Sequence, residues 1–492
     1  MIPDARDRLA RLFRNTFGHA PAHIAALGAD GSKRRYFRLQ GEDQTVIGAA
    51  NNDRRENTAF LFLSRHFRRH GLPVPEIYAD DLDQGVYLQQ DLGDETLFSR
   101  VASVRAEDGT LPDRLAAARA EEGTFPERLA AIYRRVLDDL PRFQVTAAED
   151  LDFSVCYPRR RFDGQSIQWD LNYFKYHFLK LVPVDFDEQA LENDFERFTA
   201  YLLEADTHHF LYRDFQSRNI MLHDGRPHYI DYQGGRQGAL QYDVASLLQD
   251  GRADIPWATR DELLDYYVEK IGSYAAVSRA SFLSHYYGYA LVRLMQALGA
   301  YGYRGLYEGK SHFLASISHG VRNLEGLLAR AALPVDLPEL DRAWSRIVDD
   351  PALRRMGAVS GEGLTVHLWS FSYHLGVPRD PSGNGGGFIF DCRIVKNPGR
   401  IPEYAALTGK DAPVAVFLDE NEEARTFLED ARTMVDRAVE HHLRRGFTDL
   451  TVAFGCTGGQ HRSVYFAERL AAHLKERPGL TVRLRHREQE DS

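Results

Sequence analysis

Residues 208–235 read HHFLYRDFQSRNIMLHDGRPHYIDYQGG and combine strand-like runs with a spaced set of oxygen-bearing side chains. The runs FLY and IMLHDGRPHYI predict short strands, and the Asp-Gly pair inside the second run predicts a hairpin turn. Asp214 and Asn219 lie between the two runs, and Asp231 follows Asn219 by twelve residues. Magnesium-assisted phosphoryl transfer requires two acids and an amide oxygen in one place. We therefore predict that Asp214 accepts a hydroxyl proton and that Asn219 and Asp231 bind the metal.

Residues 27–39, LGADGSKRRYFRL, predict a strand, a polar turn and a second strand upstream of these acids. Glycines expose backbone N–H groups, and these groups together with cations are what a triphosphate needs. A glycine-rich hairpin alone is a weak signal, but its position ahead of Asp214 in the chain strengthens it. The predicted nucleotide-binding residues are Gly28, Gly31, Ser32, Lys33, Arg34 and Arg35.

The segment from Tyr212 to Asn219 resembles the catalytic loop of the protein-kinase-like enzymes, specifically the aminoglycoside-phosphotransferase-like branch of small-molecule kinases. In that branch the loop typically reads HxDxxxxN and is followed by a metal-binding Asp in an IDF or IDW sequence. Tyr212 stands at the His position, whose role is mainly packing. Asp243, in QYDVASLL, matches an acid that supports the catalytic loop in this family, and a helix N-cap is the alternative.

A narrower resemblance covers about residues 5–330. The stretches DGSKRRYFRL, GLPVPEIYADDLDQGVYLQQDLGDETL, YRDFQSRNIML, IDYQGGRQGALQYDVASLLQD and ALVRLMQALGAYGY look like the anomeric sugar kinases of cell-wall recycling. Those enzymes act on N-acetylmuramate and N-acetylglucosamine, so the resemblance implies ATP-dependent phosphorylation of a sugar C1 hydroxyl with ATP and Mg²⁺ as cofactors. It does not identify the residues that contact the sugar. The polar and aromatic stretch at 166–179 is either a wall of the sugar site or an amphipathic core helix.

The run TVIGAANND at 45–53 departs from the general kinase pattern, because it has no Lys to hold the nucleotide phosphates. Glu56 stands where the acidic partner of that Lys is usual. Either Arg34, Arg35 or Arg38 supplies the charge, or nucleotide binding is weak and the chain is a pseudokinase. The anomeric sugar kinases also lack an obvious Lys at this place, which favours the first alternative.

Residues 450–474, LTVAFGCTGGQHRSVYFAERLAAHL, predict a strand, a Gly-rich loop and a helix. Gly458 and Gly459 allow backbone N–H groups to converge, and the following helix adds the positive end of its dipole. This arrangement predicts an oxyanion site for a phosphate group. The spacing from Cys456 to Arg462 also fits the Cys-x5-Arg signature of cysteine phosphatases, so phosphatase action is an alternative.

Residues 361–488 resemble the C-terminal domain of the RapZ family. The loop GCTGGQHRSV is a near copy of the family sequence, and SFSYHLGVPRD, FIFDCRIVKNP, LTGKDAPVAVFLD and RLRHRE also match. The resemblance implies that the domain binds an amino-sugar phosphate, glucosamine 6-phosphate, and the family also takes part in RNA binding and adaptor function in some bacteria. The implied phosphosugar-binding residues are Thr457, Gly458, Gly459, His461 and Arg462.

Two departures limit this transfer. Gly399 and Arg400 follow Asn-Pro where RapZ proteins often carry a ligand-binding His, and the tail after Thr481 balances its arginines with acids. Lys and Arg number 61 against 71 Asp and Glu, and a net charge of −10 argues against a protein built to coat nucleic acid. RNA binding is therefore not expected. The N-terminal P-loop domain usual in RapZ is replaced by the kinase-like region, and no GxxxxGK[ST] sequence occurs.

The pattern of elements predicts two domains in the 492 residues. The first, 1–334, has a small lobe to about residue 93 and a large lobe from about 94. Three prolines between 334 and 351 predict a linker at 335–360. The second domain, 361–492, is predicted to contain strands with helices between them. The strand-like runs are LTVHLWSF, FIFDCR, VAVFL, LTVAFG and LTVRLR. The expected fold class is an α+β bilobal protein-kinase-like domain followed by a separate α/β domain with a partly parallel sheet.

The composition, with 43% hydrophobic and 27% charged residues, is typical of a globular protein. The three cysteines, Cys156, Cys392 and Cys456, show no disulfide or zinc spacing, and no signal peptide or membrane-length run occurs. We therefore expect a cytoplasmic chain with no membrane partner, and homo-oligomerisation is left open. Residues 105–118 and 119–132 form a tandem repeat, which is either a surface insertion or a lid.

Two functional hypotheses follow from these patterns. The first is an ATP- and Mg²⁺-dependent kinase of a small-molecule amino sugar, N-acetylmuramate or N-acetylglucosamine, with a C-terminal phosphosugar-sensing domain and a place in cell-wall recycling. The second is a regulatory adaptor without catalysis, made of a pseudokinase and a RapZ-like ligand-binding or RNA-binding module.

Overall fold

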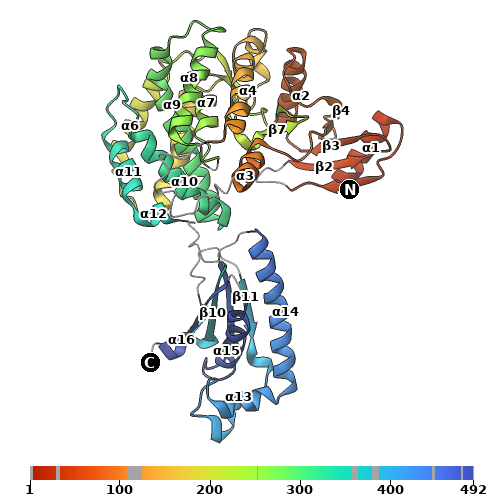
Figure 1. Ribbon diagram of the computed structural model, residues 1–492, viewed down its shortest axis with the longest axis vertical. Helices are drawn as coiled ribbons and strands as arrows, with labels where there is room; N and C mark the ends of the chain where they lie inside the picture. The colour runs from red at the N-terminus through yellow and green to blue at the C-terminus, as the bar shows by residue number, and fades with distance from the viewer. Residues whose placement is uncertain are drawn as a thin grey trace. The chain divides into compact units, whose positions relative to one another are not determined.

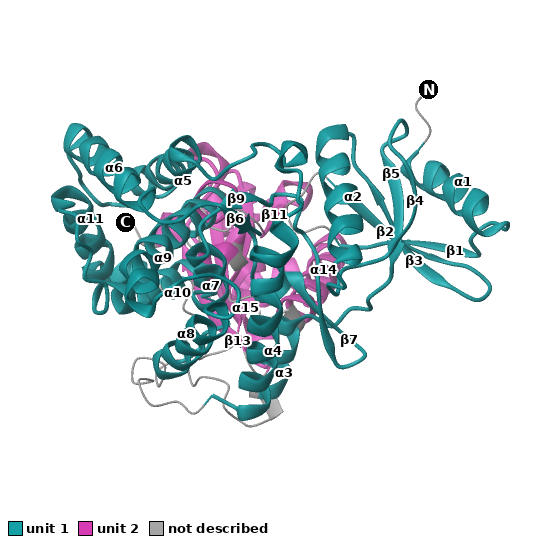
Figure 2. Cartoon of the chain, turned by 90° about the horizontal axis from the view of Figure 1, so that it is seen from above, with its two compact units in different colours: residues 1–303, 316–356 teal, residues 304–315, 357–492 magenta. Residues whose placement is uncertain are grey.

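The computed structural model describes residues 4–28, 34–107, 125–251, 253–356, 364–378, 387–445, 449–477 and 480–490. The chain forms two compact units (Figure 1; teal and magenta in Figure 2). Unit 1 covers Met1–Tyr303 and Ser316–Met356, and unit 2 covers Arg304–Ala315 and Gly357–Ser492. Most of the tandem repeat at 105–132 lies outside the described residues.

The small lobe of unit 1 is an antiparallel sheet of order β1-β2-β3-β5-β4. Helix α1 packs on one face through Leu9 and Phe13, which meet Leu39, Val46 and Leu88 of the sheet in one apolar cluster. Asp4 caps α1, and Gly18 ends it with a left-handed φ of 85°. The elements are α1 (Ala5–Phe17), β1 (His23–Ala26), β2 (Arg35–Gln40), β3 (Thr45–Ala50), α2 (Arg54–Arg69), β4 (Ile77–Asp81) and β5 (Val86–Gln90).

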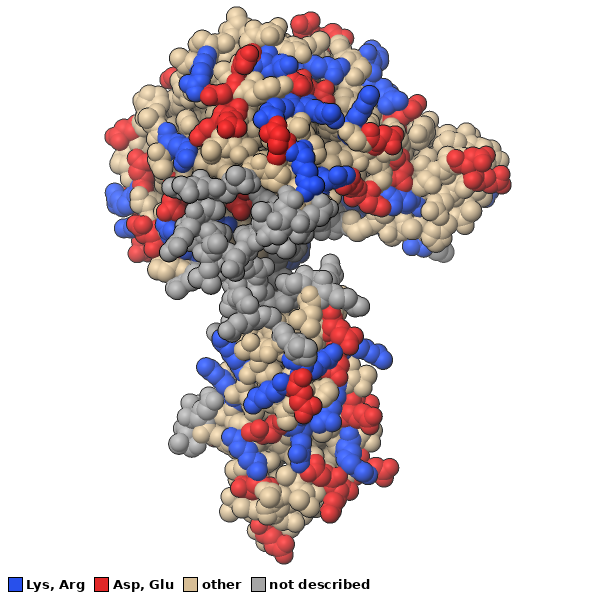
Figure 3. Space-filling view, in the orientation of Figure 1, with Lys and Arg blue, Asp and Glu red and all other residues tan. Residues whose placement is uncertain are grey.

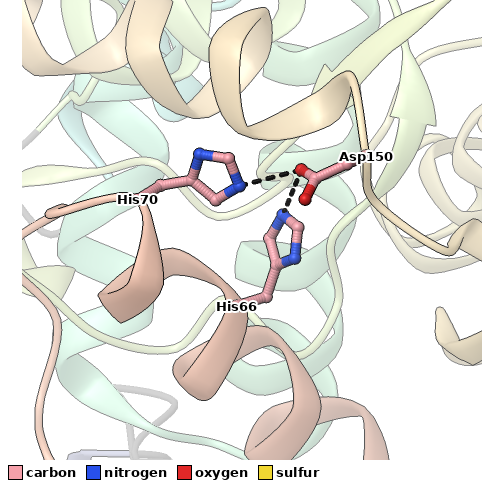
Figure 4. A group of neighbouring side chains, drawn as sticks. All are labelled: His66, His70 and Asp150. Carbon is pink, nitrogen blue, oxygen red and sulfur yellow. Dashed lines mark hydrogen bonds and ion pairs between the residues drawn. The ribbon is translucent and has the colours of Figure 1, made fainter.

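Helix α2 of the small lobe is tied to the large lobe at both ends. At its start, the N-cap carboxylate of Asp53 accepts a hydrogen bond of 2.7 Å from the Tyr157 hydroxyl. At its end, His66 Nε2 donates to the Ala147 carbonyl at 2.6 Å. His70 Nε2 donates to Asp150 at 2.8 Å, and His66 Nε2 lies 3.6 Å from the same carboxylate oxygen (Figure 4).

The three ligand-type atoms of His66, His70 and Asp150 lie within 4.8 Å of one another, a spacing that a metal ion could also use. Both ring nitrogens of His66 already have partners, however, because Nδ1 accepts from the Arg69 guanidinium at 3.2 Å. Nε2 keeps the proton that it donates to Ala147, so this ring is not presented as a ligand. We interpret the cluster as a fastening of α2 to the large lobe.

The large lobe is mainly helical and carries two small β-ribbons, β6-β9 and β7-β8. These ribbons flank the loop at 212–219 and the segment at 230–235 that contains Asp231. The predicted hairpin at 220–230 is confirmed: Asp224 and Gly225 connect β7 to β8 with φ of 50° and 72°, the sign that a tight hairpin turn requires. The elements are α3 (Leu97–Glu107), α4 (Glu127–Gln144), α5 (Gly164–His177), α6 (Glu188–Leu202), β6 (His209–Leu211), β7 (Ile220–His223), β8 (Arg226–Tyr229), β9 (Arg236–Gly238), α7 (Gln241–Leu248), α8 (Trp257–Ile271), α9 (Arg279–Tyr301) and α10 (Ser311–Leu328).

The predicted linker at 335–360 differs from the structure. Helix α11 (Pro338–Asp349) and helix α12 (Pro351–Arg355) occupy most of it and belong to unit 1. Trp344 is buried and meets the Phe198 ring of α6 edge-on, and the buried Asp194 carboxylate accepts from the first backbone amides of α11. Two of the three prolines behind the linker prediction, Pro338 and Pro351, instead begin helices, since the first helical position has no partner for an N–H group.

Unit 2 contains a four-stranded sheet of order β11-β12-β10-β13, flanked by α14 and α15. All three pairings are parallel, so the described sheet is wholly rather than partly parallel. Buried side chains of the strands and helices, such as Val366, Val452 and Phe466, form its core. The elements are β10 (Leu364–Ser372), β11 (Gly387–Asp391), α13 (Ala412–Asp419), α14 (Glu422–Arg445), β12 (Asp449–Cys456), α15 (Arg462–Lys475), β13 (Leu480–His486) and α16 (Arg487–Glu490).

The strand predicted at 414–418, VAVFL, is wrong, because these residues lie in helix α13. Pro413 occupies the first turn of that helix, and the Asp411 carboxylate before it accepts from the backbone and hydroxyl of Thr408. An Asp at the N-cap position with a Pro in the first helical turn is a helix-start signal that outweighs a short β-branched run. Among the described residues, none of the helices combines the length and apolar character needed to cross a membrane.

Candidate active site

The loop at 212–219 is held by a buried acid behind it. Asp243, in the first turn of α7, is fully buried and accepts hydrogen bonds from the backbone N–H groups of Tyr212 at 2.8 Å and Arg213 at 3.0 Å. The Tyr212 hydroxyl donates to the Ile230 carbonyl at 2.7 Å, and its ring packs among other aromatic rings. The prediction that Asp243 supports the loop, and that Tyr212 is a packing residue, is confirmed.

Arg213 adds a second anchor, which sequence reasoning missed. Its guanidinium binds both carboxylate oxygens of Asp170 at 2.7 and 2.6 Å, and its backbone has a left-handed φ of 82°. Asp170 comes from α5, the stretch predicted as either a sugar-site wall or a core helix. Ile167, Leu171 and Phe174 of this helix are fully buried, which favours the core helix. No local signal marks Asp170, because its role depends on a residue 43 positions away.

The three residues predicted for phosphoryl transfer lie together. Asn219 Nδ2 donates to the Asp214 carbonyl at 2.9 Å and is 3.3 Å from Asp231 Oδ2. The backbone of Asp231 has a left-handed φ of 69°, and Gln233 donates to its other oxygen at 2.7 Å. Burial, reinforced by the nearby Asp214 carboxylate, raises the pKa of Asp231. Two acids in one partly desolvated place favour a cation between them.

A cavity of about 300 Å³ opens between the small lobe and this loop. Asn219 and Asp231 line its large-lobe side, and Arg34 and Arg38 line its small-lobe side. Apolar side chains such as Ile47 and Phe60, together with the last two residues of β5 and the three that follow it (89–93), complete the wall. A partly apolar cavity with cations on one side and carboxylate and amide oxygens on the other suits a nucleoside polyphosphate.

The structure answers which arginine stands near the acid of α2. Arg34 is 2% exposed and its guanidinium lies 3.1 Å from Glu56. Arg38 is paired with Asp91 and Asp94 instead, so Arg34 is the arginine of this pair that contacts Glu56.

The other predicted nucleotide residues are distributed differently. Gly28 lines the cavity. Arg35 does not line it: its side chain is 57% exposed and lies 3.9 Å from Asp4. Gly31, Ser32 and Lys33 lie outside the described residues.

The Gly-rich loop of unit 2 connects β12 to α15 as predicted. Thr457 and Gly458 are exposed, and Gly459 has a left-handed φ of 70°. A carboxylate missed by sequence reasoning lies against this turn, because a Cβ on Gly459 would come within 2.6 Å of Glu488 Oε2. Glu488 Oε1 accepts from the Ser372 backbone at 2.8 Å, so this acid links the loop to β10.

The other two predicted phosphosugar residues are turned inward. His461 Nε2 donates to the Tyr404 carbonyl at 2.9 Å, and Arg462 donates to the Val395 carbonyl at 2.8 Å. Cys456 is 3% exposed and its Sγ lies 3.2 Å from the Ser463 hydroxyl. A buried thiol beside an Arg that serves backbone carbonyls does not favour the phosphatase alternative. Figure 3 shows basic and acidic side chains intermingled on the viewed face of unit 2.

Two family models match the chain. The phosphotransferase enzyme family matches residues 23–278, and the RapZ C-terminal domain matches residues 364–490. The first match covers the cavity and the loop at 212–219, and the second covers the sheet of unit 2 and its Gly-rich loop.

Curated relatives match about a quarter to a third of the chain. The RNase adapter protein RapZ of Sodalis glossinidius is 37% identical over 169 residues, 34% of this chain and 56% of that protein. A nucleotide-binding protein of a Janthinobacterium species is 43% identical over 125 residues, 25% of this chain and 41% of that protein. The chain thus spans about half the length of the curated relatives it matches.

Solved structures resemble the kinase-like part at low identity. A thermostable aminoglycoside phosphotransferase APH(4)-Ia is 16% identical, with a TM-score of 0.41, covering 66% of this chain and 99% of that one. Choline kinase LicA from Streptococcus pneumoniae is 13% identical, with a TM-score of 0.40, covering 63% of this chain and 94% of that one.

Proposed function

The chain belongs to the phosphotransferase enzyme family and carries a RapZ C-terminal domain, and on this premise we propose that it is an ATP- and Mg²⁺-dependent kinase of an amino sugar. N-acetylmuramate and N-acetylglucosamine are the proposed acceptors, and the anomeric hydroxyl is the proposed site of phosphorylation. The C-terminal domain is proposed to bind a phosphosugar. The observation that carries the proposal is the meeting of Asp214, Asn219 and Asp231. Asn219 and Asp231 line a cavity that Arg34 also lines, and Asp214 lies next to them outside the lining.

The donor set of this site fits magnesium. Asn219 Nδ2 is used in hydrogen bonds to Asp214 and Asp231, which directs the amide oxygen of Asn219 away from them. An amide oxygen and a carboxylate that line the cavity are hard oxygen ligands of the kind Mg²⁺ prefers. When bound, Mg²⁺ and ATP would supply the phosphoryl group and neutralise its charge.

The residues of the chain would then divide the work. The carboxylate of Asp214 has no hydrogen-bond partner among the described residues, so both of its oxygens are available to a hydroxyl. In the proposed reaction Asp214 orients the sugar hydroxyl and accepts its proton as the oxygen attacks phosphorus. Arg34, held by Glu56, contributes positive charge to the phosphate end of the cavity. Asp243 and Asp170 keep the loop in place from behind.

The test is a phosphorylation screen over neutral and acidic amino sugars, with ATP consumption measured and the product mapped by phosphorus NMR. We expect turnover of at least one amino sugar, and a loss of about 10³-fold or more in kcat for Asp214→Asn with nucleotide affinity retained. Arg226→Gln, an exposed change on β8, is the control for preparation and assay. A full panel without turnover, or an Asp214→Asn variant as active as the wild type, would refute the proposal.

A second candidate is a regulatory adaptor without catalysis. The observation that favours it is the RapZ C-terminal domain, since one relative that shares it is named an RNase adapter protein. This candidate predicts tight binding of glucosamine 6-phosphate to unit 2 with no nucleotide turnover on any sugar. The same screen, combined with calorimetry of glucosamine 6-phosphate binding, separates the two candidates.

A further inference from the structure

A buried arginine on β9 has unused hydrogen-bonding capacity. Arg236 is 7% exposed, and its Nε donates to the Gly234 carbonyl at 3.0 Å. Its two terminal nitrogens make no hydrogen bond or ion pair with any residue that the structure describes. A buried guanidinium normally has an acidic partner, because removing its charge from water is costly. Arg236 therefore presents a charged fork that a bound anion would complete.

The charges around Arg236 support this reading. The neighbouring Arg213 is already neutralised by its two-point contact with Asp170. Burial, together with the like charge of Arg213, lowers the pKa of Arg236 to about 10. Even so, Arg236 stays protonated near pH 7, and it is the cation of this pair that lacks a direct acidic contact among the described residues.

The position of Arg236 puts it on the acceptor side of the site. The segment 231–236 passes directly beside the proposed base, since a Cβ on Gly234 would lie 3.9 Å from Asp214 Oδ2. Arg236 pairs in register with Leu211 of β6, the strand that leads into the loop of Asp214. The nucleotide cavity is lined by Arg34 and Arg38 and not by Arg236. An anion at Arg236 would thus belong to the molecule that receives the phosphoryl group.

We propose that Arg236 determines acceptor specificity by binding an oxyanion, a carboxylate or a phosphate, on the sugar whose hydroxyl reaches Asp214. This inference rests on the proposed function and narrows its substrate class to acidic sugars. The planar guanidinium fork matches the paired oxygens of either group. Of the two proposed acceptors, N-acetylmuramate carries a carboxylate on its lactyl substituent and N-acetylglucosamine does not, so the acidic sugar is the preferred one.

The experiment measures sugar binding by calorimetry, with Mg²⁺ and a non-hydrolysable ATP analogue present. The ligands are N-acetylmuramate, N-acetylglucosamine 6-phosphate and neutral N-acetylglucosamine, so that the carboxylate and the phosphate are tested in separate arms. One acidic sugar is expected to bind the wild type about 30-fold more tightly than the neutral one. Arg236→Gln should reduce that ratio to within about threefold, and Arg236→Lys should restore part of it, because it keeps the charge without the fork.

The control is Arg226→Gln, which removes the same charge from the exposed surface of β8 and should leave the ratio unchanged. Equal binding of acidic and neutral sugars by the wild type, or a preference that survives Arg236→Gln, would overturn the inference. Turnover separates this failure from that of the proposed function. Acid-selective binding without any phosphorylation refutes the kinase and leaves Arg236 as an anion site, whereas equal phosphorylation of all three sugars refutes Arg236 and leaves the kinase.

Discussion

Replacement of Arg34 by Gln tests whether this residue holds the nucleotide phosphates in place of the missing third-strand Lys. Arg34 is 2% exposed, pairs with Glu56 at 3.1 Å and lines the cavity that also contains Asp231. Loss of a preorganised cation that faces phosphate oxygens in a desolvated site removes about 2–4 kcal/mol of binding. The affinity for a Mg²⁺-bound ATP analogue should therefore fall by about 30- to 10³-fold.

The structural consequence must be separated from the loss of binding. Removing one partner of a buried ion pair costs about 3–5 kcal/mol when the remaining charge is fully buried. Glu56 keeps a 26% exposed side chain and can be hydrated, so we expect a smaller loss of about 1–3 kcal/mol in urea unfolding. Arg34→Lys keeps the charge and should recover part of the affinity, and it serves as the second variant should Arg34→Gln prove unstable.

Arg35→Gln provides the discriminating comparison, because Arg35 is adjacent in sequence but has an exposed side chain outside the cavity. Its nucleotide affinity should stay within about threefold of the wild type. The reasoning is refuted if Arg34→Gln binds the ATP analogue as well as the wild type, or if Arg35→Gln causes the larger loss. Calorimetry with the nucleotide alone is the appropriate assay, since it does not depend on the identity of the sugar.

Three further expectations concern stability. Burial raises the pKa of Asp243 from 3.8 to about 7, so the folded chain binds this proton more tightly than the unfolded chain. The free energy of unfolding of unit 1, measured with urea, should therefore fall by up to about 2–3 kcal/mol between pH 5 and 7, and Asp243→Asn should remove this part of the pH dependence. The same pH dependence in the wild type and in Asp243→Asn would contradict the assignment. Trp344→Ala should destabilise unit 1 by about 3–5 kcal/mol, and a change below about 0.5 kcal/mol would mean that α11 is an undocked connection after all. Gly409→Ala would place a Cβ against the His461 carbonyl and the Tyr465 amide. We expect the free energy of unfolding of unit 2 to fall by about 1–3 kcal/mol in calorimetric unfolding, with nucleotide binding unchanged. An unchanged stability of unit 2 would show that this close approach is not required.

The sequence was most informative where function depends on residues close together in the chain. Asp214, Asn219 and the Asp224-Gly225 turn lie within a dozen residues, and their spacing was enough to predict the loop, the hairpin and the cluster with Asp231. Asp243 was predictable from the resemblance, because its distance from the loop is fixed by one intervening ribbon.

Long-range partners were not predictable in the same way. The sequence gives no reason to distinguish Arg34 from Arg35. The backbone at the start of β2 directs Arg34 toward Glu56 and Arg35 toward solvent, and this is visible only in the structure. Asp170 and Arg236 acquire their roles through Arg213, which neither residue adjoins in sequence. The inward orientation of Arg462 likewise depends on carbonyls from the segment after β11.

Some errors arose from weighing local signals wrongly rather than from missing information. At 412–419 the apolar run favoured a strand, but Pro413 after Asp411 marked a helix start. At 338 and 351 prolines were taken as breaks, although each stands at the first position of a helix and Asp350 caps the second of these helices.

The attachment of α2 to the large lobe at both ends restricts how the position of Glu56 relative to Arg34 can change. Glu56 sits in the first turn of that helix, with the Asp53–Tyr157 bond directly before it and the His66 and His70 contacts three turns later. A helix held at both ends can neither rotate nor shift along its axis unless the contacts at both ends break together. A rigid movement of the helix that withdraws Glu56 from Arg34 would have to break the contacts at both ends of α2 together, so we expect Glu56 to keep its place beside Arg34.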